Sequence, residues 1–332
     1  MRPTALITGG AGYIGSHTVR ALAQAGWNAT VLDNLSSGHR AALPPGVPLH
    51  QQDLNDAAAT TRLVREISPD LIIHFAGAIE AGESMTQPER FYRENIVNAL
   101  NLLEAARLNG VKRLVFSSSA AVYGNAEHLP VGEDEPKNPT NVYGETKLFI
   151  ETALRAYGHA HGLQAIALRY FNACGADPSG EIGPDHRHKT HLLTVAILAA
   201  RHHQPIQVFG TDYDTPDGTC IRDYVHVNDL ASAHVLAANA LMDGHPGGAY
   251  NVGLGHGHSV LQVLDAVETT SGQPLERRYA PRRHGDPAAL VADPTRIQRD
   301  LGWQAQHTNL QEIVQTAWKW HEQHPNGYGD RG

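Results

Sequence analysis

The feature that most constrains the fold is a short apolar run that leads through a glycine-rich turn into a helical pattern. Residues 4–8 are rich in β-forming side chains, and the next seven residues are Gly-Gly-Ala-Gly-Tyr-Ile-Gly. Gly10, Gly12 and Gly15 match the G-x-G-x-x-G spacing of dinucleotide-binding turns, and Gly9 with the last two matches a wider-spaced variant. Glycines there let the backbone approach a pyrophosphate, whose charge lies against the positive end of the next helix. The segment is therefore predicted to bind a dinucleotide.

An acidic residue follows at the distance that such a site requires. Asp33 ends the second predicted strand, eighteen residues after Gly15. A carboxylate there can accept hydrogen bonds from both ribose hydroxyls and repels a 2′-phosphate, which favours NAD over NADP. The alternative is that Asp33 only caps a turn before Asn34, Ser36 and Gly38. Together with the glycine-rich turn, the NAD interpretation is preferred.

Short β-rich runs alternate with longer helical patterns in the first half of the chain. The predicted strands are 4–8, 29–32, 71–75, 114–117 and 164–169, and the predicted helices are 14–25, 57–67, 91–108 and 142–161. This alternation is typical of βαβ units with helices on both faces of a parallel sheet. The predicted class is α/β: a Rossmann-like doubly wound parallel sheet with a smaller, mixed α/β C-terminal substrate domain.

The composition of the chain changes near Ala173, where a segment rich in Pro, Gly, Asp and His begins. We predict a cofactor-binding Rossmann domain over 1–172 and a mainly substrate-binding domain over 173–332, with residues of about 222–252 as candidates for packing back on the first domain. No flexible linker separates the two, so the cleft between them is the expected site of chemistry.

Composition excludes several classes of function. Lys and Arg number 26 against 34 Asp and Glu, a net charge of -8, so no basic surplus exists for binding nucleic acid. No apolar run approaches the ~18 residues of a membrane span, and no targeting segment is evident. Cys174 and Cys220 are interpreted as reduced thiols of a cytoplasmic protein. Histidine pairs occur without a cysteine or carboxylate cluster, so no metal site is predicted; they are His186 with His188, His202 with His203, and His256 with His258.

A tyrosine and a lysine stand four residues apart in the fourth predicted helix, which puts their side chains on one face. They are Tyr143 and Lys147. A cation at ~4 Å can lower the pKa of a phenol from its usual ~10 by about 3 units, which would make Tyr143 a base for a hydroxyl proton. Ser119, which follows the fourth predicted strand, could bond the reacting oxygen. The spacing alone is weak, since Y-x-x-x-K also occurs on solvated helix faces.

Longer stretches resemble the UDP-glucose 4-epimerase family of extended short-chain dehydrogenases/reductases, and together they extend over nearly the whole chain. The stretches are TGGAGYIGSHTV at 8–19, DNLSSG at 33–38, HFAG at 74–77, SSSAAVYG at 117–124, YGETK at 143–147, RYFN at 169–172, FGTDYDTPDGTCIRDYVHV at 209–227, YNVG at 250–253, PRRHGDPAALVADP at 281–294 and HPNGYG at 324–329. Several are specific to the epimerases within the wider superfamily.

The resemblance implies tightly held NAD, a UDP-sugar substrate, a homodimer and three sets of site residues. The catalytic set is Ser119, Tyr143 and Lys147. The NAD contacts are Gly9, Gly12, Tyr13, Ile14, Gly15, Asp33, Asn34, Ser36, Asp53, Leu54, Phe75, Ala76, Gly77, Asn95, Tyr143, Lys147 and Phe171. The UDP-sugar contacts are Ser119, Tyr143, Asn172, His191, Leu192, Phe209, Arg222, Arg283, Asp286 and Leu290. Independently of the resemblance, the guanidinium groups of Arg222 and Arg283 suit a diphosphate in charge and geometry. The alternative is that these two arginines form surface ion pairs.

The implied reaction interconverts UDP-glucose and UDP-galactose without net oxidation. Tyr143 takes the O4 proton as the C4 hydride passes to NAD⁺, the 4-keto sugar turns over, and the hydride returns to its other face. A pentose or uronate 4-epimerase is an alternative. A nucleotide-sugar dehydratase is disfavoured, because Ala120 and Ala121 follow Ser119 where dehydratases carry an Asp-Glu pair. A catalytically silent NAD-binding regulator would be expected to lack the Tyr-Lys pair.

Three positions depart from the family pattern. Ile79 stands where many relatives carry a lysine, and Glu94 where they carry an asparagine, so the contacts on the nicotinamide side stay open. Leu290 stands where some relatives place a tyrosine beside the sugar. A smaller side chain there leaves room for an N-acetyl group, so UDP-N-acetylhexosamines are candidate substrates as well.

Overall fold

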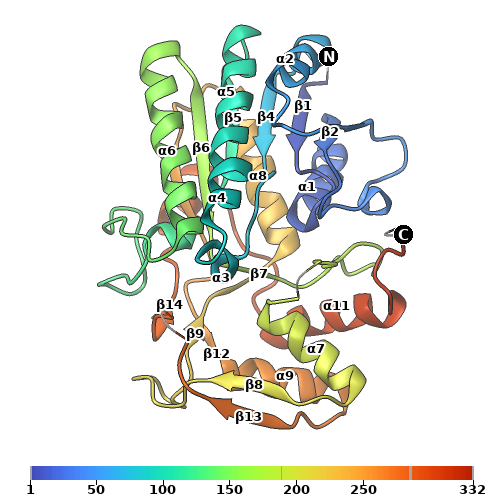
Figure 1. Ribbon diagram of the computed structural model, residues 1–332, viewed down its shortest axis with the longest axis vertical. Helices are drawn as coiled ribbons and strands as arrows, with labels where there is room; N and C mark the ends of the chain where they lie inside the picture. Colours follow the sequence, from blue (N-terminus) through green and yellow to red (C-terminus); the bar gives the residue numbers. More distant parts are fainter. Residues whose placement is uncertain (1, 188, 284–285, 331–332) are drawn as a thin grey trace.

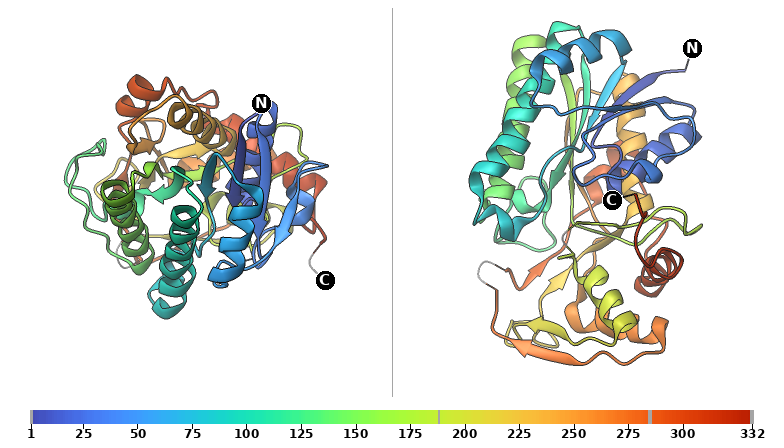
Figure 2. Two further views of the ribbon diagram at one scale, coloured as in Figure 1. Left: turned by 90° about the horizontal axis from the view of Figure 1, so that it is seen from above. Right: turned by 45° about the vertical axis from the view of Figure 1, so that its right-hand side comes forward.

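The computed structural model describes residues 2–187, 189–283 and 286–330. The larger part of the molecule is a parallel sheet flanked by helices, and a smaller part with short strands and three helices lies beneath it in Figure 1. The right-hand view of Figure 2 shows the same two parts, with the sheet of the larger part between helices on its two sides.

Seven parallel strands form the main sheet, in the order β11-β6-β5-β4-β1-β2-β3. Their bounds are β1 Thr4–Thr8, β2 Asn28–Asp33, β3 Leu49–Gln51, β4 Leu71–His74, β5 Arg113–Ser119, β6 Gln164–Tyr170 and β11 Gly248–Val252. The strands are apolar on both faces: Leu6 packs into the core on one side of the sheet and its neighbour Ile7 into the core on the other. This double burial is what a parallel sheet covered by helices on both faces requires.

Helices cover both faces of the sheet. One face carries α1 (Tyr13–Gln24), α8 (Val227–Met242) and α10 (Thr295–Leu301), and the other carries α2 (Ala57–Ile67), α5 (Asn98–Leu108) and α6 (Val142–His161). Within the described residues, no helix combines the length and the apolar character that a bilayer-spanning segment needs.

The smaller part has a core of its own. Its helices are α7 (Leu192–His202), α9 (Val260–Ser271) and α11 (Leu310–Gln323), which pack together around buried aliphatic side chains. Its strands are β7 Asn172–Cys174, β8 Ile206–Phe209, β9 Ile221–Arg222, β10 Tyr224–His226, β12 His258–Ser259, β13 Arg277–Ala280 and β14 Ala289–Leu290. Two short helices, α3 (Ala81–Ser84) and α4 (Pro88–Phe91), follow β4 on the sheet side of the cleft.

The predicted fold class is confirmed, and two predicted details are corrected. The sheet has seven strands where the sequence patterns gave five, because β3 and β11 are too short or too irregular to show a period. The predicted helix 91–108 is interrupted: a π-helical turn at Tyr92–Val97 connects α4 to α5. The segment containing α8 and β11 lies with the larger part, where α8 packs on α1 and β11 pairs with β6. The domain boundary near residue 172 stays a prediction.

Candidate active site

A cavity of about 780 Å³ lies where the two parts meet. It opens at the carboxyl ends of β1 and β4, the neighbouring strands at which the sheet order changes direction. Open α/β sheets bind their ligands at this kind of crevice, because the loops leaving the two strands diverge there. Residues of the smaller part, including His191, Arg222 and Leu290, close the opposite wall.

The glycine-rich turn between β1 and α1 is packed too tightly for side chains. A Cβ on Gly15 would lie 2.3 Å from the carbonyl oxygen of Gly9, and Gly9, with φ of +71°, would place a Cβ 2.5 Å from the backbone nitrogen of Ala76. The first amides of α1 have no intrahelical partners and face the cavity end of the helix. This is the cradle that a pyrophosphate requires.

Asp33 ends β2 beside this turn, and its carboxylate is held by the backbone. Oδ2 accepts a hydrogen bond from the amide of Ala11 at 3.0 Å, and Oδ1 accepts one from the amide of Leu35 at 2.8 Å. Burial raises the pKa of Asp33, and these bonds lower it. The side chain borders the cavity, so the position suits ribose hydroxyls. Asn34 extends the same edge, since its Nδ2 donates to Asp53 Oδ2 at 2.9 Å.

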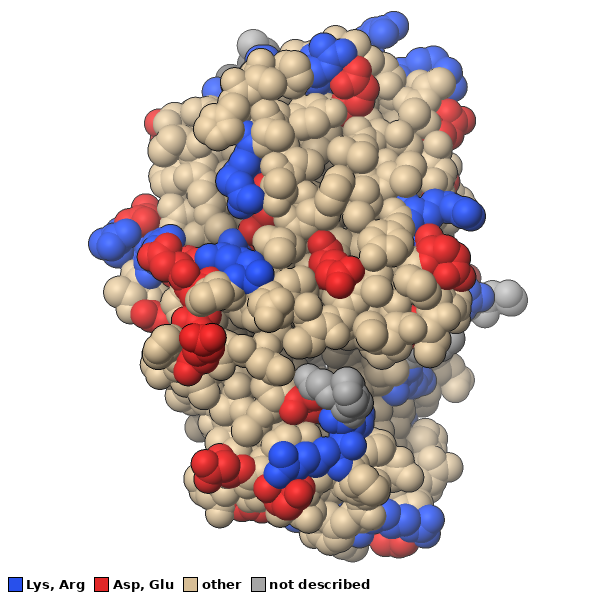
Figure 3. Space-filling model, turned by 60° about the vertical axis from the view of Figure 1, so that its left-hand side comes forward, with Lys and Arg blue, Asp and Glu red and all other residues tan. Residues whose placement is uncertain are grey.

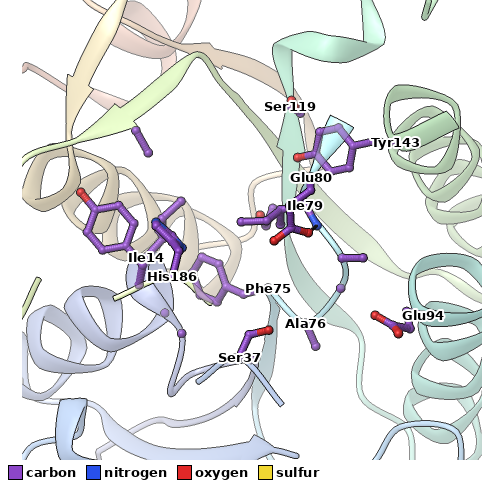
Figure 4. A pocket seen from close by; sticks show the side chains of 18 of the residues that line it. Ile14, Ser37, Phe75, Ala76, Ile79, Glu80, Glu94, Ser119, Tyr143 and His186 are labelled. Atoms are coloured by element: carbon purple, nitrogen blue, oxygen red, sulfur yellow. Dashed lines mark hydrogen bonds between the residues drawn. The ribbon is translucent and has the colours of Figure 1, made fainter. Parts of the chain in front are cut away.

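The proposed catalytic residues come from β5 and α6. Asn141 caps α6 by accepting from the amide of Gly144 at 2.8 Å, which fixes the first turn that carries Tyr143. Ser119 ends β5, and Figure 4 shows the two hydroxyl-bearing side chains together on one wall of the cavity. Lys147 lies one turn further along α6, only 2 % exposed, beneath Tyr143.

Burial is the main influence on the pKa values of Tyr143 and Lys147. Burial raises the pKa of Tyr143, and the hydrogen bond with Ser119 only partly opposes this effect. Lys147 Nζ lies 5.6 Å from the centre of the Tyr143 ring and donates to the carbonyl of Ser117 at 2.8 Å. Burial lowers the pKa of this lysine to about 8. Lys147 is buried and its ammonium lies against the ring of the half-buried Tyr143. That this cation, together with the positive nicotinamide of NAD⁺, lowers the pKa of the phenol stays a prediction.

Two arginines that the sequence suggests for the diphosphate, Arg222 and Arg283, are held by backbone and carboxylate groups. Arg222 donates to the carbonyl of Pro287 at 2.9 Å and lies 3.6 Å from Asp286. Arg283 stacks over the ring of Phe209 at 4.5 Å and lies 3.5 Å from the same carboxylate. Both guanidinium groups therefore lie near one end of the cavity, although the second is more exposed.

Most of the predicted site residues line this one cavity. Those that do not are Asn95, Lys147, Leu192, Phe209 and Arg283. Asn95 is buried below the cavity, where its Oδ1 accepts from the amide of Ala78 at 2.7 Å and its Nδ2 donates to Thr146 at 2.9 Å. Asn95 thus shapes the turn after β4. Whether the predicted residues touch cofactor or substrate stays a prediction.

Sequence reasoning missed several lining residues, among them Glu80, Arg90, His186 and Tyr328. Glu80 adjoins the HFAG stretch, which could have drawn attention to it. Tyr328 comes from the last described segment of the chain: its hydroxyl accepts from the amide of Gly183 at 3.0 Å, and the nearby Asp330 bonds to the buried ring of His39. Only the fold brings this segment to the cavity.

The described residues contain no group of three or more His, Cys, Asp or Glu side chains arranged to hold a metal ion. Of the histidines noted in the sequence, His188 lies outside the described residues. Cys174 and Cys220 are both buried and unbonded to each other.

Comparison with known proteins shows the family to which the chain is similar. Residues 5–253 match the NAD dependent epimerase/dehydratase family. The chain is 47% identical to the UDP-glucose 4-epimerase of Azospirillum brasilense, over 99% of this chain and 95% of that one. It is 44% identical to the UDP-glucose 4-epimerase of Lacticaseibacillus casei, over 99% of both chains.

Solved structures agree with these sequence matches. The UDP-glucose 4-epimerase of Brucella ovis in complex with NAD has a TM-score of 0.93 at 42% identity, covering 95% of this chain and 97% of the other. The enzyme of Bifidobacterium longum in complex with NAD⁺ and UDP has a TM-score of 0.92 at 38% identity, covering 98% and 99%.

Proposed function

The chain belongs to the NAD dependent epimerase/dehydratase family, and from this premise we propose that it catalyses the interconversion of UDP-glucose and UDP-galactose at C4 of the sugar. It is an NAD-dependent epimerase, and the predicted family, fold and cofactor are confirmed. The observation that carries the proposal is the cavity that joins the glycine-rich turn and Asp33 to Ser119 and Tyr143.

The residues near the turn after β1 fit the cofactor. The close-packed glycines leave room for a pyrophosphate, and the anchored carboxylate of Asp33 suits the adenosine ribose and disfavours a 2′-phosphate. When bound, NAD supplies a hydride acceptor and donor, so that C4 can be oxidised and reduced again without net change.

The protein's own groups supply the proton chemistry. Tyr143 accepts the proton of the sugar O4 and later returns it, and Ser119 bonds the same oxygen and keeps it in line with the phenol. Because burial raises the pKa of the Tyr143 phenol, removing its proton requires positive charge nearby. Lys147 provides one such charge from beneath the ring.

The opposite face of the sugar must be presented before the hydride returns, so the sugar must turn while the nucleotide stays in place. Arg222 lines the cavity, Arg283 lies beside the same Asp286 carboxylate, and both guanidinium groups suit a diphosphate. Concentrating binding energy on the diphosphate leaves the hexose free to reorient.

The test incubates the purified holoenzyme with UDP-glucose and follows the C4 configuration by ¹H NMR. UDP-galactose should accumulate to an equilibrium mixture with no net NADH formation. A 4-keto-6-deoxy product would instead indicate a dehydratase, and no turnover with any UDP-hexose would refute the proposal.

UDP-N-acetylhexosamines are a second candidate substrate class. Leu290 lines the cavity near Arg222, with which it pairs in the β9–β14 register. A leucine there leaves more space beside the sugar than a tyrosine. Leu290→Tyr should lower turnover of UDP-N-acetylglucosamine relative to UDP-glucose, and an unchanged ratio would exclude this role.

We also propose that the protein is a homodimer in the cytoplasm. The adjoining helices α5 and α6 expose large apolar side chains, namely Val97 just before α5 at 45%, Leu108 at 54% and Phe149 at 46%. Figure 3 shows few charged side chains in the middle of the upper half of this side of the molecule. Such a face suits a second copy. Analytical ultracentrifugation of the wild type and of Phe149→Glu tests the dimer, and the variant should sediment as a monomer.

The proposed location in the cytoplasm is supported by Cys174 and Cys220, which are not bridged, as is usual in a reducing compartment.

A further inference from the structure

A carboxylate stands on the same cavity wall as the catalytic tyrosine, and the proposed reaction does not use it. Glu80 precedes α3, borders the cavity and is half-buried. Figure 4 shows it beside Tyr143 and Ser119. Its carboxylate lowers the acidity of the phenol, adding to the larger effect of burial on the pKa of Tyr143. Because this negative charge opposes deprotonation of Tyr143, Glu80 does not assist the proposed proton transfer and must have a different role.

The backbone holds Glu80 at a fixed place relative to Tyr143. On one side, the carboxamide of Asn95 bonds the amide and the carbonyl of Ala78, at 2.7 and 3.1 Å. On the other side, the Ser84 hydroxyl accepts a hydrogen bond from the amide of Tyr143 at 3.1 Å, and the amide of Ser84 donates to the carbonyl of Glu80 at 3.0 Å. The segment 78–84 is thus attached to Asn95 at its start and to Tyr143 on α6 at its end.

The side chain itself is not neutralised. It does not cap α3, and within the part of the chain that the structure describes its one polar contact is with the amide of Ile79 at 3.3 Å. Among the described residues Glu80 takes part in no ion pair, whereas Arg90 on the same wall is already paired with Glu83 at 2.7 Å and Glu94 at 3.0 Å. The charge also reaches across the cavity. The imidazole of His191, which lines the cavity, has a pKa lowered by desolvation and raised in part by Glu80.

We propose that Glu80 selects for sugars that are neutral at C6 and excludes UDP-hexuronates, a role that rests on the proposed 4-epimerase function. A C6 hydroxyl can donate a hydrogen bond to the carboxylate, whereas a C6 carboxylate can only accept and carries like charge. Because each epimer must present a different face of C4, the C6 group swings from one wall of the cavity to the other. One of the two poses therefore brings it toward the Glu80 wall, and both poses are needed for turnover.

The size of the discrimination follows from charge repulsion in a partly enclosed site. A C6 carboxylate cannot make the contact that a C6 hydroxyl makes, and even when it draws back to roughly 10 Å the two like charges, at an effective dielectric of about 20, reduce binding on the order of tenfold. Such an unfavourable contact is an established way to reject a wrong substrate, and it costs the neutral hexose nothing.

The experiment compares the holoenzyme of the wild type with Glu80→Gln and Glu80→Asp. For each, kcat/KM for UDP-glucose and the competitive inhibition constant of UDP-glucuronate are measured, together with any conversion to UDP-galacturonate. Glu80→Gln should improve the selectivity for UDP-glucuronate over UDP-glucose about tenfold, since it keeps the shape and removes the charge. Glu80→Asp should keep the wild-type selectivity.

The matched control is Glu94→Gln, which removes a paired carboxylate from the same cavity near Ala76. A selectivity change in this variant as large as that of Glu80→Gln would overturn the assignment, because it would reflect net charge and not position. A selectivity of Glu80→Gln within twofold of the wild type would overturn it too. Absence of UDP-glucose turnover in the wild type would refute the proposed function instead, so the two failures are distinguishable.

Discussion

The buried ion pair beneath β5 gives the sharpest test of how the site is supported. Arg169 on β6 and Glu151 on α6 form two parallel hydrogen bonds, Nε to Oε1 at 2.9 Å and a terminal nitrogen to Oε2 at 2.6 Å. Their side chains are 4 % and 3 % exposed. Ser118, the neighbour of Ser119, donates to the same carboxylate at 2.6 Å, and the arginine also donates to the hydroxyl of Tyr123. The pair therefore connects β5, which ends at Ser119, to α6, which carries Tyr143.

Glu151→Gln removes one charge and keeps the volume, which leaves the guanidinium buried without a counter-charge. Breaking a buried pair in this way costs about 3–5 kcal/mol of unfolding free energy. With an unfolding entropy of roughly 2.1 cal/mol/K per residue, a chain of 332 residues converts that loss into a fall in Tm of about 4–7 °C.

Differential scanning calorimetry of the holoenzyme measures the change. The control is Glu104→Gln, which breaks the exposed pair with Arg107 on α5 and should leave Tm unchanged within error. Replacing both partners, as in Glu151→Leu with Arg169→Met, should restore much of the loss, because no charge then stays buried alone. A Tm of Glu151→Gln within 1 °C of the wild type would refute this reasoning.

Three further predictions concern the proton, the cofactor and pH. Tyr143→Phe should lower kcat by about 10²–10⁴-fold while calorimetric UDP-glucose affinity changes little, and undiminished turnover would contradict the role of the phenol. Asp33→Asn should weaken NAD binding and strengthen NADP binding in a fluorescence titration, because repulsion of the 2′-phosphate is removed; an unchanged ratio of the two affinities would be inconsistent with a ribose contact. Burial lowers the pKa of His17 to about 4, so the folded chain binds fewer protons than the unfolded chain, and stability falls as pH drops from about 6.5 to 4, by up to roughly 3 kcal/mol. Urea unfolding at several pH values should show a shallower fall for His17→Gln, and parallel curves would disprove this origin.

Local sequence patterns predicted the parts of the site that local geometry determines. The glycine-rich turn, Asp33 at the end of β2 and the four-residue spacing of Tyr143 and Lys147 each depend on residues within one turn or strand. A short stretch of chain fixes such features, so composition and spacing are sufficient to find them.

The features that were missed or mistaken depend on burial and on distant contacts. The pKa of Tyr143 is raised because the surrounding fold desolvates the phenol, which no spacing rule contains. β11 joins the main sheet by pairing with β6, about eighty residues earlier in the chain. The segment around Glu80 is held by two distant residues, because Asn95 bonds Ala78 and the amide of Tyr143 on α6 bonds Ser84.

The contact between His39 and Asp330 joins positions 291 residues apart. His39 sits in the loop after Asp33, and its ring also lies against Asp185 and Tyr328. During synthesis on a ribosome, the loop that carries His39 is made early, but the carboxylate that braces it emerges only with residue 330. A nick near residue 325 would therefore loosen a loop that lies almost three hundred residues earlier in the chain.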